Sequence, residues 1–417
     1  MCAGDRGSPV IAVRGRPSSL WASRASSVLL TTLSLLGYPH ALDAQPLAYV
    51  ANFSSGTISV IDTATNTAVA APIPVGVGPI DVAVTPDGRH AYVTNLNSSF
   101  VSVIDTATST AMRVTVGLRF FGVAVTPDGA HAYVSNNAIG KLSLIDVATN
   151  TPEPASIDLN ASRPVFLAVA PDGDRAYVSE YASGTVSVID LSANTVVASI
   201  PIGGRPLGIA VSPDGTRVYV VNNLAHGAVA VVDTAMAAVV AAIPVGAYPT
   251  AVAIAPDGTR AYATNSRSGS VSVIETVTNT VVGSIPVGAG PTGIAITPDG
   301  KRAYVNNHDA GTVSVIDTAV GQVVGSEIPV GQEPRGIAIQ PVSTGVPPTP
   351  PPHAAPCSGD CDGSGAVTVN EIIVLVNIDL GTAEVSACRN GIPQGDAVDI
   401  TLIVKAVGYA LTNCPTS

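Results

Sequence analysis

Tryptophan and charged side chains are scarce in this chain of 417 residues. Its only tryptophan is Trp21, aromatic residues occupy 4% of the positions, and charged residues occupy 12%. A hydrophobic fraction of 46% with so few charges excludes an intrinsically disordered chain. The 30 acidic residues outnumber the 19 basic ones, and the resulting net charge of −11 argues against nucleic acid as a partner.

Hydrophobic runs long enough to span a membrane are missing as well. The apolar segment at residues 25–37 is shorter than the roughly 20 residues that a spanning helix needs. It follows four arginines and precedes Ala44, a small residue suited to cleavage. We interpret residues 1–44 as an export leader, the alternatives being an N-terminal arm or a misplaced start codon. Export predicts a secreted or cell-surface protein with no transmembrane anchor in the mature chain.

Cysteine is absent from the whole middle of the chain. After Cys2, the cysteines lie within the last 61 residues: Cys357, Cys361, Cys388 and Cys414. Such a cluster predicts a small module over residues 357–417 that is stapled by disulfides, with three pairings left open. A zinc site is the alternative, but this segment has no histidine and no Cys-x-x-Cys spacing.

A repeat marked by tyrosine fills the middle of the chain. The repeated tyrosines are 41 to 44 residues apart: Tyr49, Tyr92, Tyr133, Tyr177, Tyr219, Tyr262 and Tyr304. Short alternating segments and Pro-Asp-Gly turns accompany most of them, and this period is typical of a four-stranded propeller blade. In such turns proline presets φ, aspartate bonds locally and glycine takes positive φ.

The repeats predict an all-β fold, a seven-bladed β-propeller over residues 45–340. The array begins with a second strand at Tyr49 and ends with a first strand at residues 336–340. About 28 strands therefore close into a ring if the C-terminal strand completes the first blade, which removes open sheet edges. We interpret the acid that ends each third strand as a turn residue and not as a catalytic base: Asp62, Asp105, Asp146, Asp190, Asp233, Glu275 and Asp317.

The repeated segments Tyr-Val-Thr-Asn, Val-Ser-Val-Ile-Asp-Thr-Ala-Thr-Asn-Thr and Ile-Pro-Val-Gly resemble the YVTN-repeat (YncE-like) β-propeller family over residues 46–340. This resemblance implies the same fold. Members of that family are secreted or surface proteins of mostly unassigned role, and some relatives are enzymes or redox subunits. The resemblance therefore implies little about chemistry.

Catalytic signatures such as Gly-x-Ser-x-Gly, His-Glu-x-x-His and the P-loop are absent. The expected innermost strands carry mostly Gly, Ala, Val and Ile, which weakens the case for an enzyme. Arg119, Arg163 and Arg205 occupy one equivalent position in consecutive blades, with Glu180 and Tyr181 in neighbouring loops. Side by side at the channel mouth, the arginines would bind a carboxylate, a sulfate or an anionic glycan. The alternative is that they are solvated loop residues.

Residues 341–356 are rich in proline and predict a semi-rigid linker. The segment after it matches an EF-hand loop, whose expected calcium ligands are Asp360, Asp362, Ser364, Ala366, Thr368 and Glu371. Ala366 would coordinate through its carbonyl and Glu371 would bind bidentately, while Gly365 makes the sharp turn. Calcium is therefore the expected cofactor, held weakly because only three carboxylates contribute.

A second copy of this loop is damaged, because Leu402 stands where Glu371 would be. Two loop–helix units after a Pro/Thr linker resemble a type I dockerin-like domain, a small α-helical calcium-binding module. The resemblance implies docking to a cohesin-like or cell-envelope protein. Leu402 and the Gly391–Gly395 stretch depart from that family's pattern, which disfavours symmetric two-site binding. The four cysteines are also outside that pattern.

Together these features predict a secreted or cell-surface, non-catalytic binding protein. The propeller would present a platform for a ligand or partner, and the calcium-binding tail would dock it. A lactonase or hydrolase with its site at the channel mouth is the second hypothesis, and it requires a cluster of carboxylate and histidine side chains there. A structural surface-coat component is the third.

Overall fold

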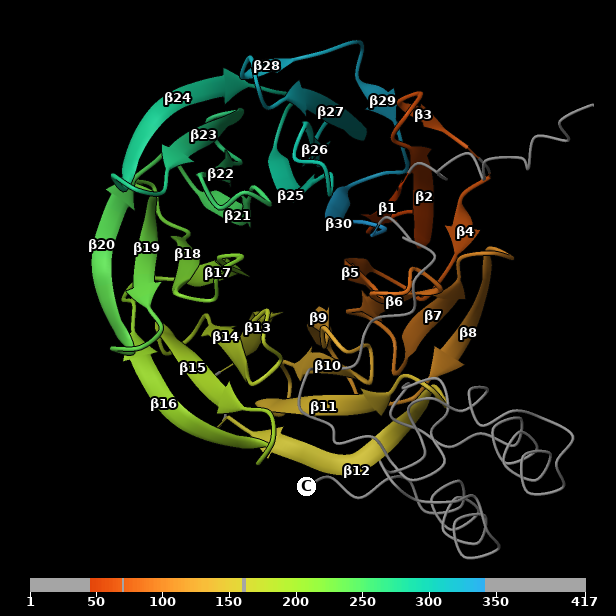
Figure 1. The fold of residues 1–417 in the computed structure, drawn as a ribbon. Helices are drawn as coiled ribbons and strands as arrows, with labels where there is room; N and C mark the ends of the chain where they lie inside the picture. Colours follow the sequence, from red (N-terminus) through yellow and green to blue (C-terminus); the bar gives the residue numbers. More distant parts are fainter. Residues whose placement is uncertain (1–45, 70, 160–162, 342–417) are drawn as a thin grey trace, which may run out of the picture. The chain divides into compact units, whose positions relative to one another are not determined.

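The computed structural model describes residues 46–69, 71–159 and 163–341, which form strands joined by turns and loops. Seven antiparallel sheets stand around a central axis like the blades of a propeller, as Figure 1 shows from the end of the axis. The predicted all-β fold with seven blades is therefore confirmed.

The blades follow one another around the ring in chain order. The strands up to the third blade are β1 (Leu47–Asn52), β2 (Thr57–Asp62), β3 (Thr67–Ala68), β4 (Ile73–Pro74), β5 (Pro79–Val84), β6 (His90–Asn95), β7 (Val101–Asp105), β8 (Thr110–Val114), β9 (Phe120–Val125), β10 (His131–Asn136), β11 (Lys141–Asp146) and β12 (Thr151–Asp158). The next two blades comprise β13 (Pro164–Val169), β14 (Arg175–Glu180), β15 (Thr185–Asp190), β16 (Thr195–Pro201), β17 (Pro206–Val211), β18 (Arg217–Asn222), β19 (Ala228–Asp233) and β20 (Ala238–Pro244). The remaining strands are β21 (Pro249–Ile254), β22 (Arg260–Asn265), β23 (Ser270–Glu275), β24 (Thr280–Pro286), β25 (Pro291–Ile296), β26 (Arg302–Asn307), β27 (Thr312–Asp317), β28 (Gln322–Val323), β29 (Ile328–Pro329) and β30 (Pro334–Ile339).

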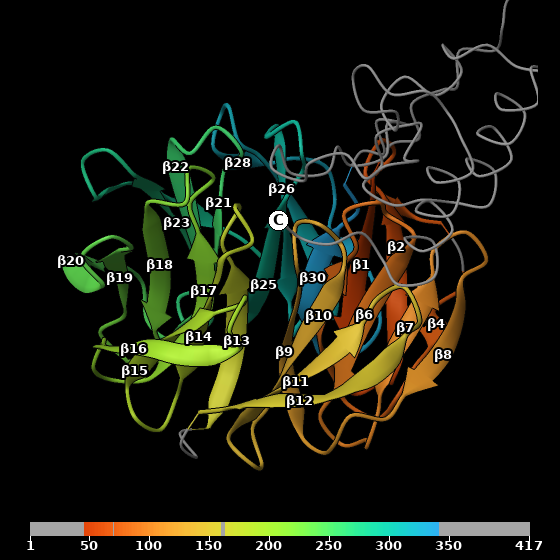
Figure 2. The ribbon, with the colours of Figure 1, turned by 60° about the horizontal axis from the view of Figure 1, so that its bottom comes forward.

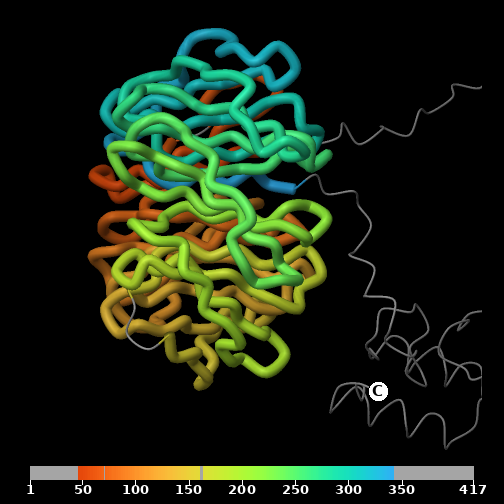
Figure 3. The backbone as a smooth tube through the Cα atoms, turned by 90° about the vertical axis from the view of Figure 1, so that its left-hand side faces the viewer, coloured from red at the N-terminus to blue at the C-terminus, as the bar shows by residue number. Residues whose placement is uncertain are grey.

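The ring closes as the sequence predicts. β30 pairs antiparallel with β1, so that Tyr49 lies opposite Ala338, and it supplies the innermost strand of the first blade. Figure 3 shows the red N-terminal and blue C-terminal segments of the propeller side by side. Closure leaves no inner strand without a partner among the described sheets.

The number of strands differs from the expected 28, because 30 strands are present among the described residues. The outermost strand is divided in two blades, into β3 and β4 in the first and β28 and β29 in the last. In the last blade Gly325 adopts a φ of 72° between the two pieces, which extended backbone cannot accommodate. This glycine explains the interruption there.

The hydrophobic core lies between the blades. One cluster joins Tyr133 and Leu142 of the third blade to Leu167 and Val178 of the fourth, and comparable clusters join the other neighbours. Figure 2 shows the strands of each blade standing face to face with those of the next. Because both faces of a middle strand are covered, β-branched side chains fill it on both sides. The repeated tyrosines are at most 2% exposed.

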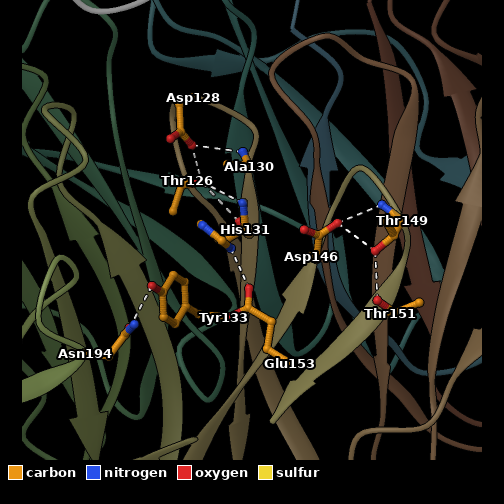
Figure 4. A network of polar contacts seen from close by, with 10 residues as sticks. All are labelled: Thr126, Asp128, Ala130, His131, Tyr133, Asp146, Thr149, Thr151, Glu153 and Asn194. Atoms are coloured by element: carbon orange, nitrogen blue, oxygen red, sulfur yellow. Dashed lines mark hydrogen bonds and ion pairs between the residues drawn. The ribbon is translucent and has the colours of Figure 1, made fainter. Parts of the chain in front are cut away.

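Short-range polar contacts hold the turns, as Figure 4 shows for the third blade. Thr126 donates its hydroxyl to Asp128 in the Pro-Asp-Gly turn, and the Ala130 amide also donates to Asp128 at 2.9 Å. Asp146 accepts hydrogen bonds from the amide and the hydroxyl of Thr149, both at 2.7 Å. The interpretation of this acid as a turn residue is confirmed.

Candidate functional site

The main candidate site is an axial cavity of about 250 Å³. Its walls are the second to fourth residues of innermost strands from all seven blades, and among them are Asp81, Phe166, Thr250 and Arg335. The cavity therefore lies near the start of these strands, on the face where loops from the outer strands enter. We call this the entry face, and it is the same face that carries the predicted arginine positions.

Small residues set the width of the ring at this level. A Cβ at Gly208 would lie 2.6 Å from the Cα of Ala251, and one at Gly336 would lie 2.6 Å from the carbonyl oxygen of Ile80. Such distances are too short for a side chain, so glycine permits neighbouring innermost strands to approach closely. Asp81 stands at the corresponding sequence position of the second blade and brings a carboxylate into this ring.

The walls of the axial cavity differ in chemistry. Consecutive strands β9, β13 and β17 contribute Phe121, Phe166 and Leu207, which form an apolar arc. On the other side, Arg335 of β30 and Asp81 of β5 contribute the charged groups. A concave, largely apolar surface with a few polar groups is typical of small-molecule sites.

Asp81 lies at the junction between these two parts. The amide of Val123 in the neighbouring blade donates to its Oδ2 at 3.1 Å, and Asp81 stays partly exposed to the channel. Burial raises the pKa of Asp81 from 3.8 to about 7, although the amides of Val123 and Val82 lower it in part. The carboxyl group therefore changes its charge near neutral pH.

Arg335 is held by an aromatic ring. Its Cζ lies 4.3 Å from the centroid of the Phe53 ring, a cation–π arrangement. Its Nε is buried and has no hydrogen-bond partner among the described residues. Burial lowers the pKa of Arg335, and the nearby charge of Glu333 opposes that effect. An orphaned donor of this kind is costly unless a ligand or water satisfies it.

Sequence reasoning missed both Asp81 and Arg335. It described the innermost strands by their common residues, Gly, Ala, Val and Ile, and that description is incomplete at these two positions. The sequence signal that could have revealed Asp81 is its departure from the repeat. Five other blades carry glycine or alanine at the same position: Gly122, Gly208, Ala251, Gly293 and Gly336. The histidine and carboxylate cluster expected of a hydrolase is not among the described cavity residues.

The three predicted arginines are all exposed, and they do not line the axial cavity. Arg119 and Arg163 have left-handed backbones, with φ of 57° and 52°. Arg205 does not, because the preceding Gly203 and Gly204 take the positive φ instead. The backbone of the three loops is therefore not equivalent, and the binding of an anion there stays a prediction.

Tyr181 and Glu180 were also predicted in loops of the entry face, and the structure places them in different surroundings. The Tyr181 ring lies 5.7 Å from the Cζ of Arg205, so the pair forms part of the rim. Glu180 was expected in a loop, but it ends β14 and is only 3% exposed. The hydroxyls of Ser187 and Thr185 donate to its carboxylate at 2.6 and 2.7 Å. Glu180 therefore fastens its own blade and is unsuited to contact a ligand.

The remaining predicted sites lie outside the described residues. These are the calcium ligands Asp360 to Glu371, the cysteines from Cys357 onward and the leader at residues 1–44. Within the part of the chain that the structure describes, no group of three or more acidic, histidine or cysteine side chains is arranged to hold a metal. No helix among these residues is long and apolar enough to cross a membrane.

Comparisons with known proteins agree with this fold. Residues 122–260 match the family model described as YNCE-like beta-propeller, whereas no curated protein matches the chain. The chain is similar to a hydrazine synthase from Kuenenia stuttgartiensis, with 24% identity, a TM-score of 0.61, and coverage of 65% of this chain and 92% of that one. A functionally unknown protein from Desulfotomaculum acetoxidans is 19% identical, with a TM-score of 0.62 and coverage of 71% and 99%. Such low identities show a shared fold alone.

Proposed function

We propose that this chain, which carries a YncE-like seven-bladed β-propeller, is a secreted or cell-surface binding protein without catalytic activity. The observation that carries the proposal is the axial cavity, which joins an apolar arc to two charged groups at the entry face. The calcium-binding tail then docks the propeller to a cohesin-like or cell-envelope protein.

The hydroxyls in the cavity walls support binding over catalysis. Thr292 donates to the carbonyl of Pro334 in the next blade at 2.9 Å, and Thr250 lies 3.1 Å from the carbonyl of Pro291. These threonines fasten adjacent innermost strands to each other. A nucleophile needs a neighbouring base that accepts its proton, and neither threonine is arranged in that way.

The rim of the entry face supports contact with a partner. Leu118, Ile139 and Tyr248 are exposed on this face, as are the three predicted arginines. Exposed aromatic and arginine side chains are enriched in protein interfaces, and guanidinium groups bind carboxylate or sulfate bidentately. We therefore propose that an anionic group of the ligand or glycan lies against Arg119, Arg163 and Arg205.

A capture experiment tests the binding function. The chain from residue 45 would be immobilised and exposed to envelope and culture-fluid fractions of the source organism, first in calcium and then in chelator. Glu371→Ala removes the bidentate calcium ligand, and the triple change of Arg119, Arg163 and Arg205 to alanine removes the rim cations. Loss of a partner with the first change assigns it to the tail, and loss with the second assigns it to the rim. Capture that ignores calcium and both variants assigns the partner to another part of the propeller, whereas the absence of any captured partner with the native chain in calcium contradicts the proposal.

A hydrolase of lactonase type is the second candidate, and Asp81 is the observation that favours it. A carboxyl group with a pKa of about 7 is suited to act as a general base at neutral pH. The test is a panel of simple lactones, with hydrolysis followed by proton release. Hydrolysis by the native chain that Asp81→Asn abolishes would establish the enzyme, and the absence of turnover on the whole panel would reject it.

A further inference from the structure

The two charged residues of the axial cavity come from neighbouring strands. Asp81 belongs to β5 and Arg335 to β30, and these strands pack against each other at the channel. A Cβ at Gly336, the residue after Arg335, would lie 2.9 Å from Oδ1 of Asp81. The second oxygen of the carboxylate therefore faces the strand that carries the guanidinium.

Neither charge is neutralised by an ion pair within the described residues. Asp81 uses its Oδ2 to accept the Val123 amide, and the Cζ of Arg335 lies over the Phe53 ring while its Nε has no hydrogen-bond partner among the described residues. These contacts hold the two groups in place without satisfying their charges. Because an uncompensated charge in a partly buried site is costly, the arrangement is complementary to a ligand that brings both opposite charges.

The apolar arc stands beside this pair of charges. Phe121, on the strand after β5 in the ring, and Phe166 and Leu207, on the next two innermost strands, provide aromatic and aliphatic surface. The cavity volume of about 250 Å³ lies just below the range of pockets for drug-sized molecules, so the ligand is small.

We propose that the axial cavity binds a small zwitterion of the amino-acid type, with an ammonium group, a carboxylate and an apolar body. The ammonium group contacts Oδ1 of Asp81, the carboxylate contacts the guanidinium of Arg335, and the apolar body lies on Phe121 and Phe166. An amine or an acid alone leaves one of the two charges unmatched. This inference deepens the proposed binding function, on which it rests.

Isothermal titration calorimetry of the chain from residue 45 tests the inference at pH 8, where Asp81, with a pKa of about 7, is mostly ionised. L-phenylalanine is the probe. Phenethylamine and 3-phenylpropanoate are the matched compounds, since each keeps the ring and one of the two charges. We expect L-phenylalanine to bind at least ~10-fold more tightly than either compound, because only it makes both charge-assisted contacts. Equal or tighter binding of a singly charged compound overturns the proposal, as does the absence of L-phenylalanine and L-leucine binding at millimolar concentration.

Two variants of cavity residues test which side chain contacts the ammonium group and which contacts the carboxylate. Asp81→Asn should weaken L-phenylalanine binding by at least ~10-fold and leave 3-phenylpropanoate binding no weaker, and Arg335→Gln should weaken L-phenylalanine and 3-phenylpropanoate alike. The control Arg113→Gln changes an exposed arginine of the outermost strand β8, which lies over the Phe100 ring and outside the cavity, so L-phenylalanine should bind it as it binds the native chain. Binding that neither cavity variant weakens overturns the proposal.

The probe comparison needs only the native chain and therefore stands even if a variant does not fold. Failure of L-phenylalanine to bind leaves the calcium-dependent capture of a partner unaffected, so the inference and the proposed function are judged separately.

Discussion

The hydroxyl of Tyr304 donates a hydrogen bond to Oδ1 of Asn66 at 2.5 Å, across 238 residues of sequence. Tyr304 belongs to the second strand of the last blade, and Asn66 to the turn after the third strand of the first blade. Together with the pairing of β30 and β1, this contact closes the ring. Tyr92 and Asn150 make the same contact between the second and third blades.

Replacement of Tyr304 by phenylalanine tests this contact. Tyr304→Phe leaves the buried ring in place and removes only the hydroxyl, so the free energy of unfolding should fall by about 1 kcal/mol. Tyr262→Phe is the matched control, because Gly321 occupies the turn position that Asn66 fills and offers no side-chain acceptor. Urea unfolding of both variants measures the difference. An equal loss in the two variants would show that the asparagine contributes nothing.

The ring could be predicted from the sequence because the same spacing and the same segments recur in seven repeats. The spacing of the tyrosines and the missing first strand near Tyr49 were enough to predict seven blades and the closing strand. Describing the repeats by their common residues concealed Asp81 and Arg335, because each differs from the residues at the same position of the other blades. Their chemistry depends on neighbours that are far apart in sequence, such as Phe53 and Arg335, and single-sequence spacing does not reveal such contacts.

The loops that carry the arginines show that residues at equivalent positions of the repeat can differ in backbone conformation. Arg163 and Arg205 both precede a proline, but only Arg163 takes positive φ, because two glycines before Arg205 absorb the turn. Identical spacing from a proline therefore did not fix the direction of the backbone. The break in the outermost strand of the last blade was equally hidden, since it depends on the single residue Gly325.

Close packing of the innermost strands predicts the effect of a single methyl group. Gly208→Ala places a Cβ 2.6 Å from the Cα of Ala251 on the next strand, where backbone atoms cannot move aside easily. We expect the free energy of unfolding to fall by roughly 1–3 kcal/mol. Thermal and urea unfolding provide the measurement.

Gly283→Ala in β24 is the control for that variant. The nearest atoms to its added Cβ would be those of Val273 at 3.8 Å or more, an ordinary contact distance. Alanine there should be neutral or stabilise the chain by about 0.4–1 kcal/mol, because it restricts the unfolded state. If both variants lose the same stability, close approach of the inner strands is not the cause.

The turn acids predict the behaviour of the propeller in acid. Hydrogen bonds from the hydroxyl and the amide of Thr149 hold the pKa of Asp146 below its usual value, and Thr108 does the same for Asp105. A depressed folded pKa contributes stability that is present above the unfolded pKa of 3.8 and is lost as pH falls through the folded value. Thr149→Val should therefore raise the pKa of Asp146, which NMR titration of the carboxyl carbon can follow. An unchanged pKa would assign the shift to other groups.

The pKa of Asp81 is shifted in the opposite direction to the pKa values of the turn acids. Its folded pKa of about 7 lies above the unfolded value of 3.8, so the folded state binds more protons between these two values. The preference for the protonated form contributes stability that is fully present below pH 3.8 and is lost as pH rises through about 7. Asp81→Asn removes the cost of the buried charge while its side-chain oxygen can still accept the Val123 amide.

Asp81→Asn should therefore be more stable than the native chain at pH values above about 7, by on the order of 2 kcal/mol once partial exposure is allowed for. The difference should shrink as pH falls and vanish near pH 3.8. Urea unfolding of both chains across this pH range provides the measurement. A constant difference at every pH would show that Asp81 does not titrate between these values, and that its carboxylate is already stabilised by groups inside the channel.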